Sequence, residues 1–197
     1  MRERLLDATI DCLVEYGYAG TTVTRIAERA GVTRGAQVHH FRTKDDLVTA
    51  AVTHLATRSA AISWTQIAGV ADAADPVGAL LDILWQSHLG PPFVASVELW
   101  VAARTDPGLR EHVAAVEPAL LAILRAEADR PGRRGAGLDT ELLDAVFTAM
   151  DTMRGLLISA WHLPAGQREA RWRRAREQLR AIFPDNERVR AAIAALR

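Results

Sequence analysis

The amino-acid sequence predicts an all-α fold. Apolar residues recur at the spacing of amphipathic helices along most of the chain, and no stretch alternates apolar and polar residues as a strand does. Proline and glycine punctuate these helical segments, most clearly at Asp75-Pro76, Gly90-Pro91-Pro92 and Asp106-Pro107. With 197 residues, 49% of them hydrophobic, the chain is long enough to form one or two small domains with apolar cores.

The first helix is expected to span about Arg2–Tyr16 and to end at Gly17. One side of this helix is a broad, mostly apolar face that would turn inward. This face comprises Leu5, Leu6, Thr9, Cys12, Leu13 and Tyr16.

The next two helices are short and are separated by a tight turn. Thr22 is expected to cap the first of them, which ends at Ala30, and Thr33 to cap the second. Gly31 between them can take the left-handed backbone conformation at a helix end. Two short helices around such a turn are typical of a helix-turn-helix, in which the second helix enters the major groove of DNA. An ordinary helical hairpin has the same spacing and remains an alternative at this point.

A long helix follows the helix-turn-helix. Thr43 and Asp46 have the spacing of a capping box, which predicts a helix from Lys44 to about Ile67. A cation in the first helical turn opposes the helix dipole, so Lys44 is better explained by a contact with a DNA phosphate. Because no proline or glycine interrupts this helix, it would join the DNA-reading part to the rest of the chain as a rigid lever.

The second half of the chain predicts further helices. One begins at Pro76, and a kink is expected at Pro118 inside the segment Gly108–Arg130. Pro131–Gly137 is expected to be a loop. The other expected helices are Phe93–Arg104, Leu138–His162, Ala165–Phe183 and Asp185–Leu196.

Composition excludes several classes of protein. Formal net charge is zero, but Arg25, Arg29, Arg34, Arg42 and Lys44 stand against Glu28 alone between residues 24 and 44. Such a local basic surface suits phosphate neutralisation. Cys12 is the only cysteine, so a disulfide within the chain is excluded. No signal peptide or membrane-spanning run is evident, and a soluble cytoplasmic protein is expected.

The residues from Leu5 to Leu47 resemble the N-terminal domain of the TetR/AcrR family of bacterial transcriptional regulators. The match rests on spaced residues over about a quarter of the chain. They are Ala8, Gly17-Tyr18, Thr21-Thr22-Val23, Ile26-Ala27, Ala30-Gly31-Val32, Gly35, His40-Phe41, Lys44 and Leu47.

The resemblance implies a DNA-binding domain over residues 1–47 and a helical effector-binding and dimerisation domain over 48–197. The family usually has Leu-Tyr where this chain has Gln37-Val38, so Gln37 is either a buried residue or a base-reading residue. Base contacts are expected from five residues of the third helix, and phosphate contacts mainly from Thr24, Arg25, His40 and Lys44. The expected base-reading residues are Arg34, Gly35, Ala36, Val38 and His39. The full predicted DNA-binding set is Thr24, Arg25, Thr33, Arg34, Gly35, Ala36, Gln37, Val38, His39, His40 and Lys44.

A homodimer is expected from the wide apolar surface of Leu138–His162 and the apolar seam of Ala165–Phe183. The resemblance implies that these two helices pair with those of a second copy in a four-helix interface. The alternative is that one apolar stripe packs within the same subunit. The predicted interface residues are Leu142, Val146, Met153, Leu156, Trp172, Leu179 and Ile182.

A pocket for a largely apolar effector is expected between the helices of Asp75–His162. Large aromatic residues and methionine suit the wall of such a pocket, and the alternative, favoured for any single one of them, is that it belongs to the core. Arg154 would either pair with Glu98 or Asp151, or hold the polar end of the ligand. The predicted pocket residues are Trp85, Phe93, Glu98, Trp100, Phe147, Met150, Arg154 and Trp161.

Enzyme and metal chemistry find little support in the sequence. The six histidines are scattered, and no nucleophile motif or ligand spacing for a structural metal is present, so no cofactor is expected. The sequence therefore predicts a ligand-responsive repressor that binds a palindromic operator as a dimer. The alternatives are a DNA-binding regulator controlled by a protein partner, and a helical enzyme or carrier with a vestigial motif.

Overall fold

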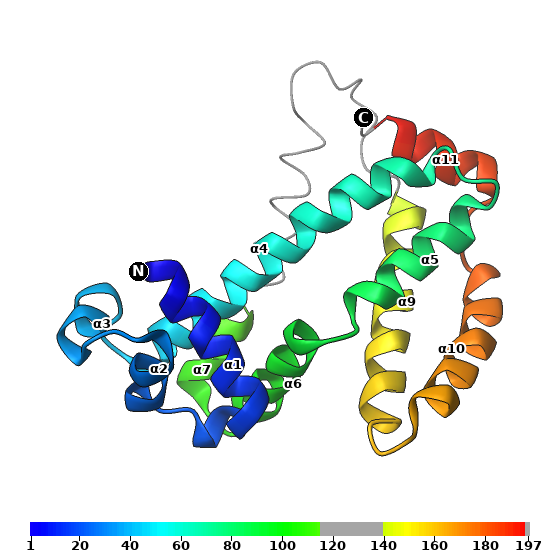
Figure 1. The fold of residues 1–197 in the computed structure, drawn as a ribbon. Helices are drawn as coiled ribbons and strands as arrows, with labels where there is room; N and C mark the ends of the chain where they lie inside the picture. Colours follow the sequence, from blue (N-terminus) through cyan, green and yellow to red (C-terminus); the bar gives the residue numbers. More distant parts are fainter. Residues whose placement is uncertain (115–139, 196–197) are drawn as a thin grey trace. The chain divides into compact units, whose positions relative to one another are not determined.

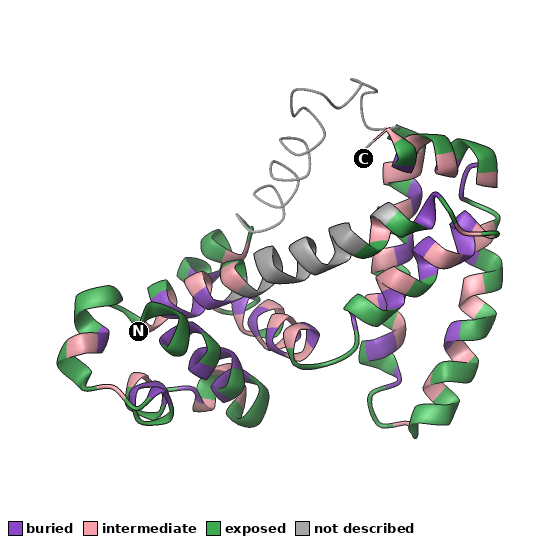
Figure 2. Ribbon diagram, turned by 45° about the horizontal axis from the view of Figure 1, so that its top comes forward, coloured by how far each residue is buried: buried purple, intermediate pink, exposed green. Residues whose placement is uncertain are grey.

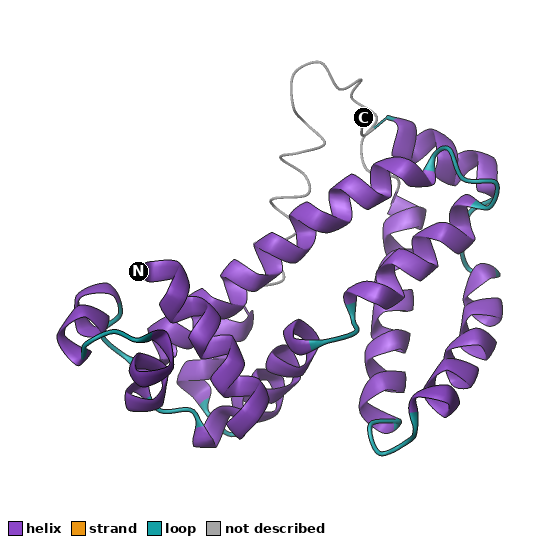
Figure 3. Cartoon of the chain, in the orientation of Figure 1, coloured by secondary structure: helices purple, strands orange, loops and turns teal. Residues whose placement is uncertain are grey.

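The computed structural model describes residues 1–114 and 140–195. Every regular element in these residues is a helix, as Figure 3 shows, which confirms the all-α prediction. The kink expected at Pro118 and the loop expected at Pro131–Gly137 lie outside the described residues, as do residues 115–130 and 138–139 of the helices predicted there. The chain divides into two compact units.

The first unit comprises Met1–Ala60 and the described part of Leu89–Ala122. Its helices, labelled in Figure 1, are α1 (Arg2–Gly20), α2 (Val23–Ala30), α3 (Arg34–His40), the first part of α4 (Lys44–Val70), α6 (Pro91–Ala103) and α7 (Pro107–Ala114). The long uninterrupted helix predicted from Lys44 is confirmed. It continues three residues past the predicted end, to Val70.

The core of the first unit lies between α1 and α6. Leu5, Leu6 and Leu13 of α1 are fully buried, and Ala95 and Leu99 of α6 belong to the same apolar cluster, which appears purple in Figure 2. The predicted inward face of α1 is confirmed except at Tyr16, which is 40% exposed. The helix-turn-helix contacts α1 through α2, and α1 in turn packs against α6, a segment about 80 residues further along the chain.

The second unit comprises Ala61–His88 and the described part of Ile123–Arg197. Besides the end of α4, it contains α5 (Pro76–Ser87), α9 (Thr140–Ser159), α10 (Ala165–Arg180) and α11 (Asn186–Ala194). The helix start predicted at Asp75-Pro76 is confirmed, because Asp75 accepts a hydrogen bond of 3.2 Å from the Gly78 N–H.

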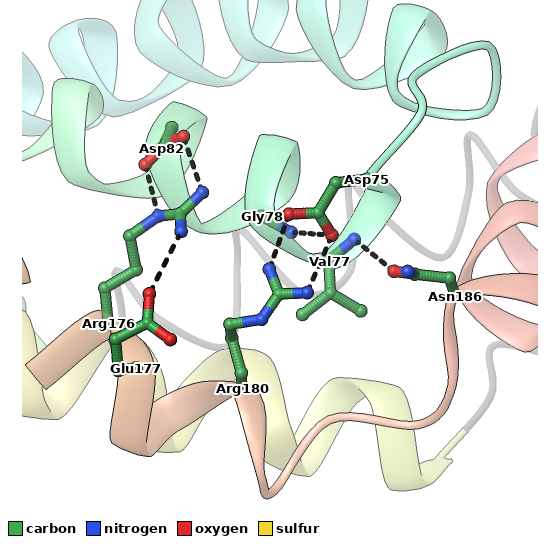
Figure 4. Close-up of polar contacts among 8 residues, drawn as sticks. All are labelled: Asp75, Val77, Gly78, Asp82, Arg176, Glu177, Arg180 and Asn186. Atoms are coloured by element: carbon green, nitrogen blue, oxygen red, sulfur yellow. Dashed lines mark hydrogen bonds and ion pairs between the residues drawn. The ribbon is translucent and has the colours of Figure 1, made fainter.

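Arginines of α10 hold α5 through ion pairs, drawn in Figure 4. Arg180 donates to both carboxylate oxygens of Asp75 at 2.5 and 3.0 Å, and Arg176 donates to both oxygens of Asp82 at 2.8 and 2.9 Å. The Arg180 guanidinium holds the pKa of the Asp75 carboxyl below its usual value. Asp75 thereby caps α5 and fixes α10 with the same side chain, while the Val77 N–H donates to Asn186 at the start of α11.

Two tryptophans join α5 and α10 in the second unit. Trp85 of α5 and Trp172 of α10 stack with ring centroids 4.6 Å apart and ring planes 2° from parallel, and both are buried. On α9 the most buried residues are Ala145, Ala149 and Met153, at a spacing of four. The covered part of α9 is therefore a narrow stripe within the wide apolar surface that was predicted for Leu138–His162.

Candidate nucleic-acid interface

Local hydrogen bonds define the helix-turn-helix. The Thr22 hydroxyl accepts from the Arg25 N–H at 3.3 Å and begins α2, and the Thr33 hydroxyl accepts from the Ala36 N–H at 3.3 Å and begins α3. Between them Gly31 has φ 61° and ψ 41°, the left-handed conformation expected at that position. Both predicted caps and the glycine turn are confirmed, so α2 and α3 have fixed ends. Arg4 of α1 adds hydrogen bonds to the carbonyl oxygens of Ala30 and Gly31.

One face of α3 is open to solvent. Arg34, Gly35, Val38 and His39 are all exposed and occur at positions i, i+1, i+4 and i+5, which share one side of a helix. His40 is also exposed, and its ring lies edge-on to that of His39 with centroids 5.4 Å apart. Ala36 is half-buried. The exposed face therefore contains most of the residues predicted to read base edges.

Gln37 is a correction to the predicted DNA-binding set. Its side chain is 0% exposed, and its Nε2 donates a hydrogen bond of 2.7 Å to the Phe41 carbonyl oxygen. Of the two roles left open for Gln37, the buried one is observed. The burial of Gln37 could have been inferred from Phe41, because residues four apart lie on the same face of a helix and Phe41 is buried. A buried amide that caps the end of α3 is not available to a base.

The predicted phosphate-binding residues differ in how much they are already engaged. Thr24 and Arg25 are exposed on α2, but the Arg25 guanidinium donates to the Gly20 carbonyl oxygen at 2.5 Å and lies 4.7 Å from the Tyr16 ring centroid. Arg29 is paired with Glu15 and Asp11 of α1. Arg34 and Arg42 are exposed. The local basic surface is therefore smaller than the count of arginines suggested.

Lys44 is half-buried at the first turn of α4. Its Nζ donates to the Tyr18 carbonyl oxygen at 2.6 Å and lies 3.7 Å from the centroid of the Tyr18 ring. Burial lowers the pKa of the Lys44 ammonium. In this structure Lys44 thus ties α4 to the end of α1, a role that sequence reasoning missed. Its predicted phosphate contact stays a prediction.

Tyr18, one of the residues that carry the family resemblance, is the centre of a small polar cluster that the sequence did not predict. Its hydroxyl donates to Asp45 at 2.7 Å, and its backbone N–H donates to Glu98 of α6 at 3.4 Å. Burial and the Asp45 carboxylate raise the pKa of the Tyr18 phenol. Gly17 just before it has φ 65° and ψ 177°, and a Cβ there would lie 2.8 Å from Oε2 of Glu98. This backbone bend turns Tyr18 toward α4 and α6.

The predicted effector-pocket residues are distributed over both units. Phe93, Glu98 and Trp100 of α6 belong to the first, where the Phe93 and Trp100 rings meet edge-on with centroids 6.1 Å apart. Trp85, Phe147, Met150, Arg154 and Trp161 belong to the second. There Arg154 pairs with Asp151 at 3.0 Å, the structural alternative named from the sequence. Trp161 was predicted to face inward, which is wrong: it is 47% exposed, because it follows the last turn of α9.

Several predicted dimer residues are covered within the subunit. Met153, Trp172 and Leu179 are buried in the second unit, so assigning them to an intersubunit face was wrong. Trp172 is covered because it stacks on Trp85. Leu142, Val146 and Leu156 are half-buried, and Ile182 is 43% exposed, so these four remain accessible. Sequence periodicity identified an apolar seam but could not identify its partner.

An open groove of about 480 Å³ lies between α9 and α10. Leu156 and Ala175 supply apolar side chains, and polar or charged residues surround them. The remaining lining residues are Thr152, Ser159, Arg171, Arg174 and Gln178. In the described residues no group of three or more His, Cys, Asp or Glu could hold a metal ion, and no described helix is long and apolar enough to cross a membrane.

Comparison with known proteins agrees with the helix-turn-helix geometry. The sequence profile of the bacterial regulatory proteins of the tetR family matches residues 5–51. The chain is 36% identical over 110 residues to the HTH-type transcriptional regulator CymR of Pseudomonas putida, covering 56% of this chain and 54% of CymR. The chain thus spans about half the length of that relative. It is 30% identical over 162 residues to the HTH-type transcriptional repressor AcnR of Corynebacterium diphtheriae, covering 80% of this chain and 79% of AcnR.

Solved structures give the same result over nearly the whole chain. The multidrug binding protein EbrR complexed with ethidium aligns with a TM-score of 0.64 at 25% identity, covering 93% of this chain and 99% of EbrR. A TetR-family member from Streptomyces coelicolor aligns with a TM-score of 0.63 at 25% identity, covering 93% and 98%. With its capped helix-turn-helix, its all-helical fold and relatives of this kind, the chain belongs to the TetR family of helix-turn-helix transcriptional regulators.

Proposed function

We propose that this regulator is a ligand-responsive repressor that binds a roughly palindromic operator as a homodimer. The observation that carries the proposal is the exposed face of α3, whose residues Arg34, Gly35, Val38 and His39 project from a helix fixed at both ends. Exposed arginine suits guanine edges or phosphates, and a rigid helix is what major-groove reading needs. The name of the relative AcnR, a repressor, favours repression.

Residues 1–47 would read DNA and residues 48–197 would handle the effector and dimerisation. Thr24, Arg25, Arg42 and His40 would position the protein on phosphates, while α3 reads base edges. Lys44 would reach a phosphate with the ammonium hydrogens that Tyr18 does not accept. No enzymatic step is assigned to the chain. As a DNA-bound repressor it would act in the cytoplasm.

The homodimer is proposed to form through the α9–α10 groove. The described part of α9 has three acidic residues and one arginine, whereas α10 has six arginines and two glutamates. Two copies of α10 would repel each other, but α10 would attract the partner's α9. Arg171 and Arg174 line the groove, and Asp144 and Asp151 are exposed on α9. A two-fold interface that buries Leu156 and Ala175 can pair these opposite charges on both sides at once.

The effector is proposed to be small and largely apolar. EbrR, the structural relative, is complexed with ethidium in one crystal structure and with malachite green in another. The half-buried Phe147 and Met150 of α9 offer the aromatic and adaptable apolar surface that suits such molecules. An effector would release DNA only by binding the DNA-incompetent state more tightly than the DNA-bound state.

A mobility-shift experiment tests the proposal. The full chain is first used to select duplexes from a random pool, and the selected duplex is then titrated with protein. We expect a dimer-sized complex on a palindromic site, and release by at least one compound from a panel of small apolar molecules. Absence of any selected duplex would overturn the DNA-binding function. A selected duplex that no compound releases would favour a regulator controlled by a protein partner instead.

A further inference from the structure

Val38 stands apart on the exposed face of α3. Its side chain is 47% exposed, and it is the one large apolar side chain among residues 22–51 that is exposed rather than buried or half-buried. A single exposed valine elsewhere on a protein surface would need no explanation. Here it lies one turn after Arg34, on the same side of the helix, where polar readers of base edges would be expected.

The residues beside Val38 allow a close approach to a bound partner. Gly35 lies next to it on the exposed face, and a Cβ added at Gly35 would meet no atom within 4 Å. Internal packing of the subunit therefore does not require a glycine at this position. The missing side chain instead leaves space for a binding partner to approach the backbone of α3. Val38 is short, so it can touch a base edge only if the backbone of α3 comes close to the groove floor. Gly35 permits this approach.

The chemistry of Val38 restricts what it can recognise. A valine side chain neither donates nor accepts a hydrogen bond, so placing it over a purine edge or a cytosine amino group would leave a polar group unpaired. The major groove presents one apolar group on its base edges, the C5 methyl of thymine. We propose that Val38 reads a thymine methyl group in each half-site, next to the base contacted by Arg34. This inference rests on the proposed function, in which α3 enters the major groove.

Deoxyuridine substitution tests the contact directly, because it removes the C5 methyl and leaves every hydrogen-bonding group of the base pair in place. In the duplex selected by the full chain, each thymine is replaced in turn by deoxyuridine, symmetrically in both half-sites. At one position we expect the affinity to fall by about fourfold for each methyl group, the effect of returning one buried methyl to water. At the other positions we expect no change.

Protein variants, combined with the deoxyuridine duplexes, complete a double-mutant cycle between Val38 and the thymine methyl group. V38A should bind the thymine and deoxyuridine duplexes with nearly equal affinity, because the contact is already lost. V38T, which keeps one methyl group and the size of the side chain, should retain part of the discrimination. R34A serves as the control: it should weaken binding to both duplexes while the ratio of the two affinities stays as in the wild type.

The outcomes separate this inference from the proposed function. If the wild-type chain selects no duplex, the DNA-binding function itself fails. If it binds a selected duplex but no deoxyuridine position changes the affinity, or if V38A retains the full thymine preference, Val38 does not read a thymine methyl. Val38 is exposed, so neither V38A nor V38T removes a core contact. Circular dichroism verifies that these two variants are folded.

Discussion

The Tyr18 hydroxyl donates a hydrogen bond of 2.7 Å to the Asp45 carboxylate, which joins the end of α1 to the first turn of α4. Glu98 of α6 accepts the Tyr18 backbone N–H in the same cluster. One residue thereby connects the helix before the helix-turn-helix, the helix after it and the helix that covers the core of the first unit.

Tyr18→Phe is expected to lower the free energy of unfolding by about 1–2 kcal/mol, because a partly buried carboxylate loses its phenol donor while the packing of the ring is kept. Chemical denaturation at fixed protein concentration measures the change. Asp45→Asn retains an acceptor oxygen and should cost less. In the double variant the two losses should not add, and full additivity would show that the pair contributes no coupling energy.

Trp172→Ala is expected to lower the free energy of unfolding by about 3–5 kcal/mol, since it removes a buried indole stacked on Trp85 and leaves a cavity. Loss of the fold, rather than simple dissociation of a folded dimer, is the expected result. Trp161→Ala is the matched control, because Trp161 is half-exposed and should change stability little. Folded monomers of the Trp172 variant would contradict the assignment of this residue to the subunit core.

Because His88 is buried, the free energy of unfolding is expected to fall in mild acid. Burial lowers the pKa of its imidazole; the nearby Arg154 lowers it further, whereas the Leu84 carbonyl and Asp151 act in the opposite direction. The unfolded chain takes up the proton at the ordinary pKa of about 6.5. Stability is therefore full above that value and falls as the pH drops from it toward the lower folded-state pKa.

The measurement compares the free energy of unfolding at pH 7.5 and pH 5.5 for the wild type and His88→Gln. The difference between the two pH values should be smaller in the variant, because the buried group that must stay neutral has been removed. An equal pH dependence in both proteins would mean that His88 does not contribute to it.

A charge exchange tests the proposed dimer. Replacing Arg171 and Arg174 by glutamate should raise the dimer dissociation constant by about tenfold or more, because acidic side chains would then face the partner's acidic α9. Replacing Asp144 and Asp151 by arginine should do the same. An equimolar mixture of the two variants should recover dimers, which sedimentation can detect. Dimers of wild-type affinity in each variant alone would place the interface elsewhere.

The helix ends and the turn of the helix-turn-helix were determined by the sequence alone. Thr22, Thr33 and Asp75 each accept a hydrogen bond from the backbone N–H three residues later, and Thr43 and Asp46 bond each other's backbone as a capping box does. Such bonds join neighbours along the chain, so local residue types are enough to predict them. The left-handed Gly31 is local in the same sense.

Only the tertiary structure decided which apolar and polar side chains are available for function. Periodicity identified the seam of Trp172 and Leu179 but not its cover: both residues are buried within the subunit, and Trp172 stacks on Trp85 of α5. Glu98, predicted for a ligand, accepts the Tyr18 N–H from a position 80 residues away in sequence. Such partners are brought together by packing of distant helices, and the helical period fixes which face a residue occupies but not what lies against that face.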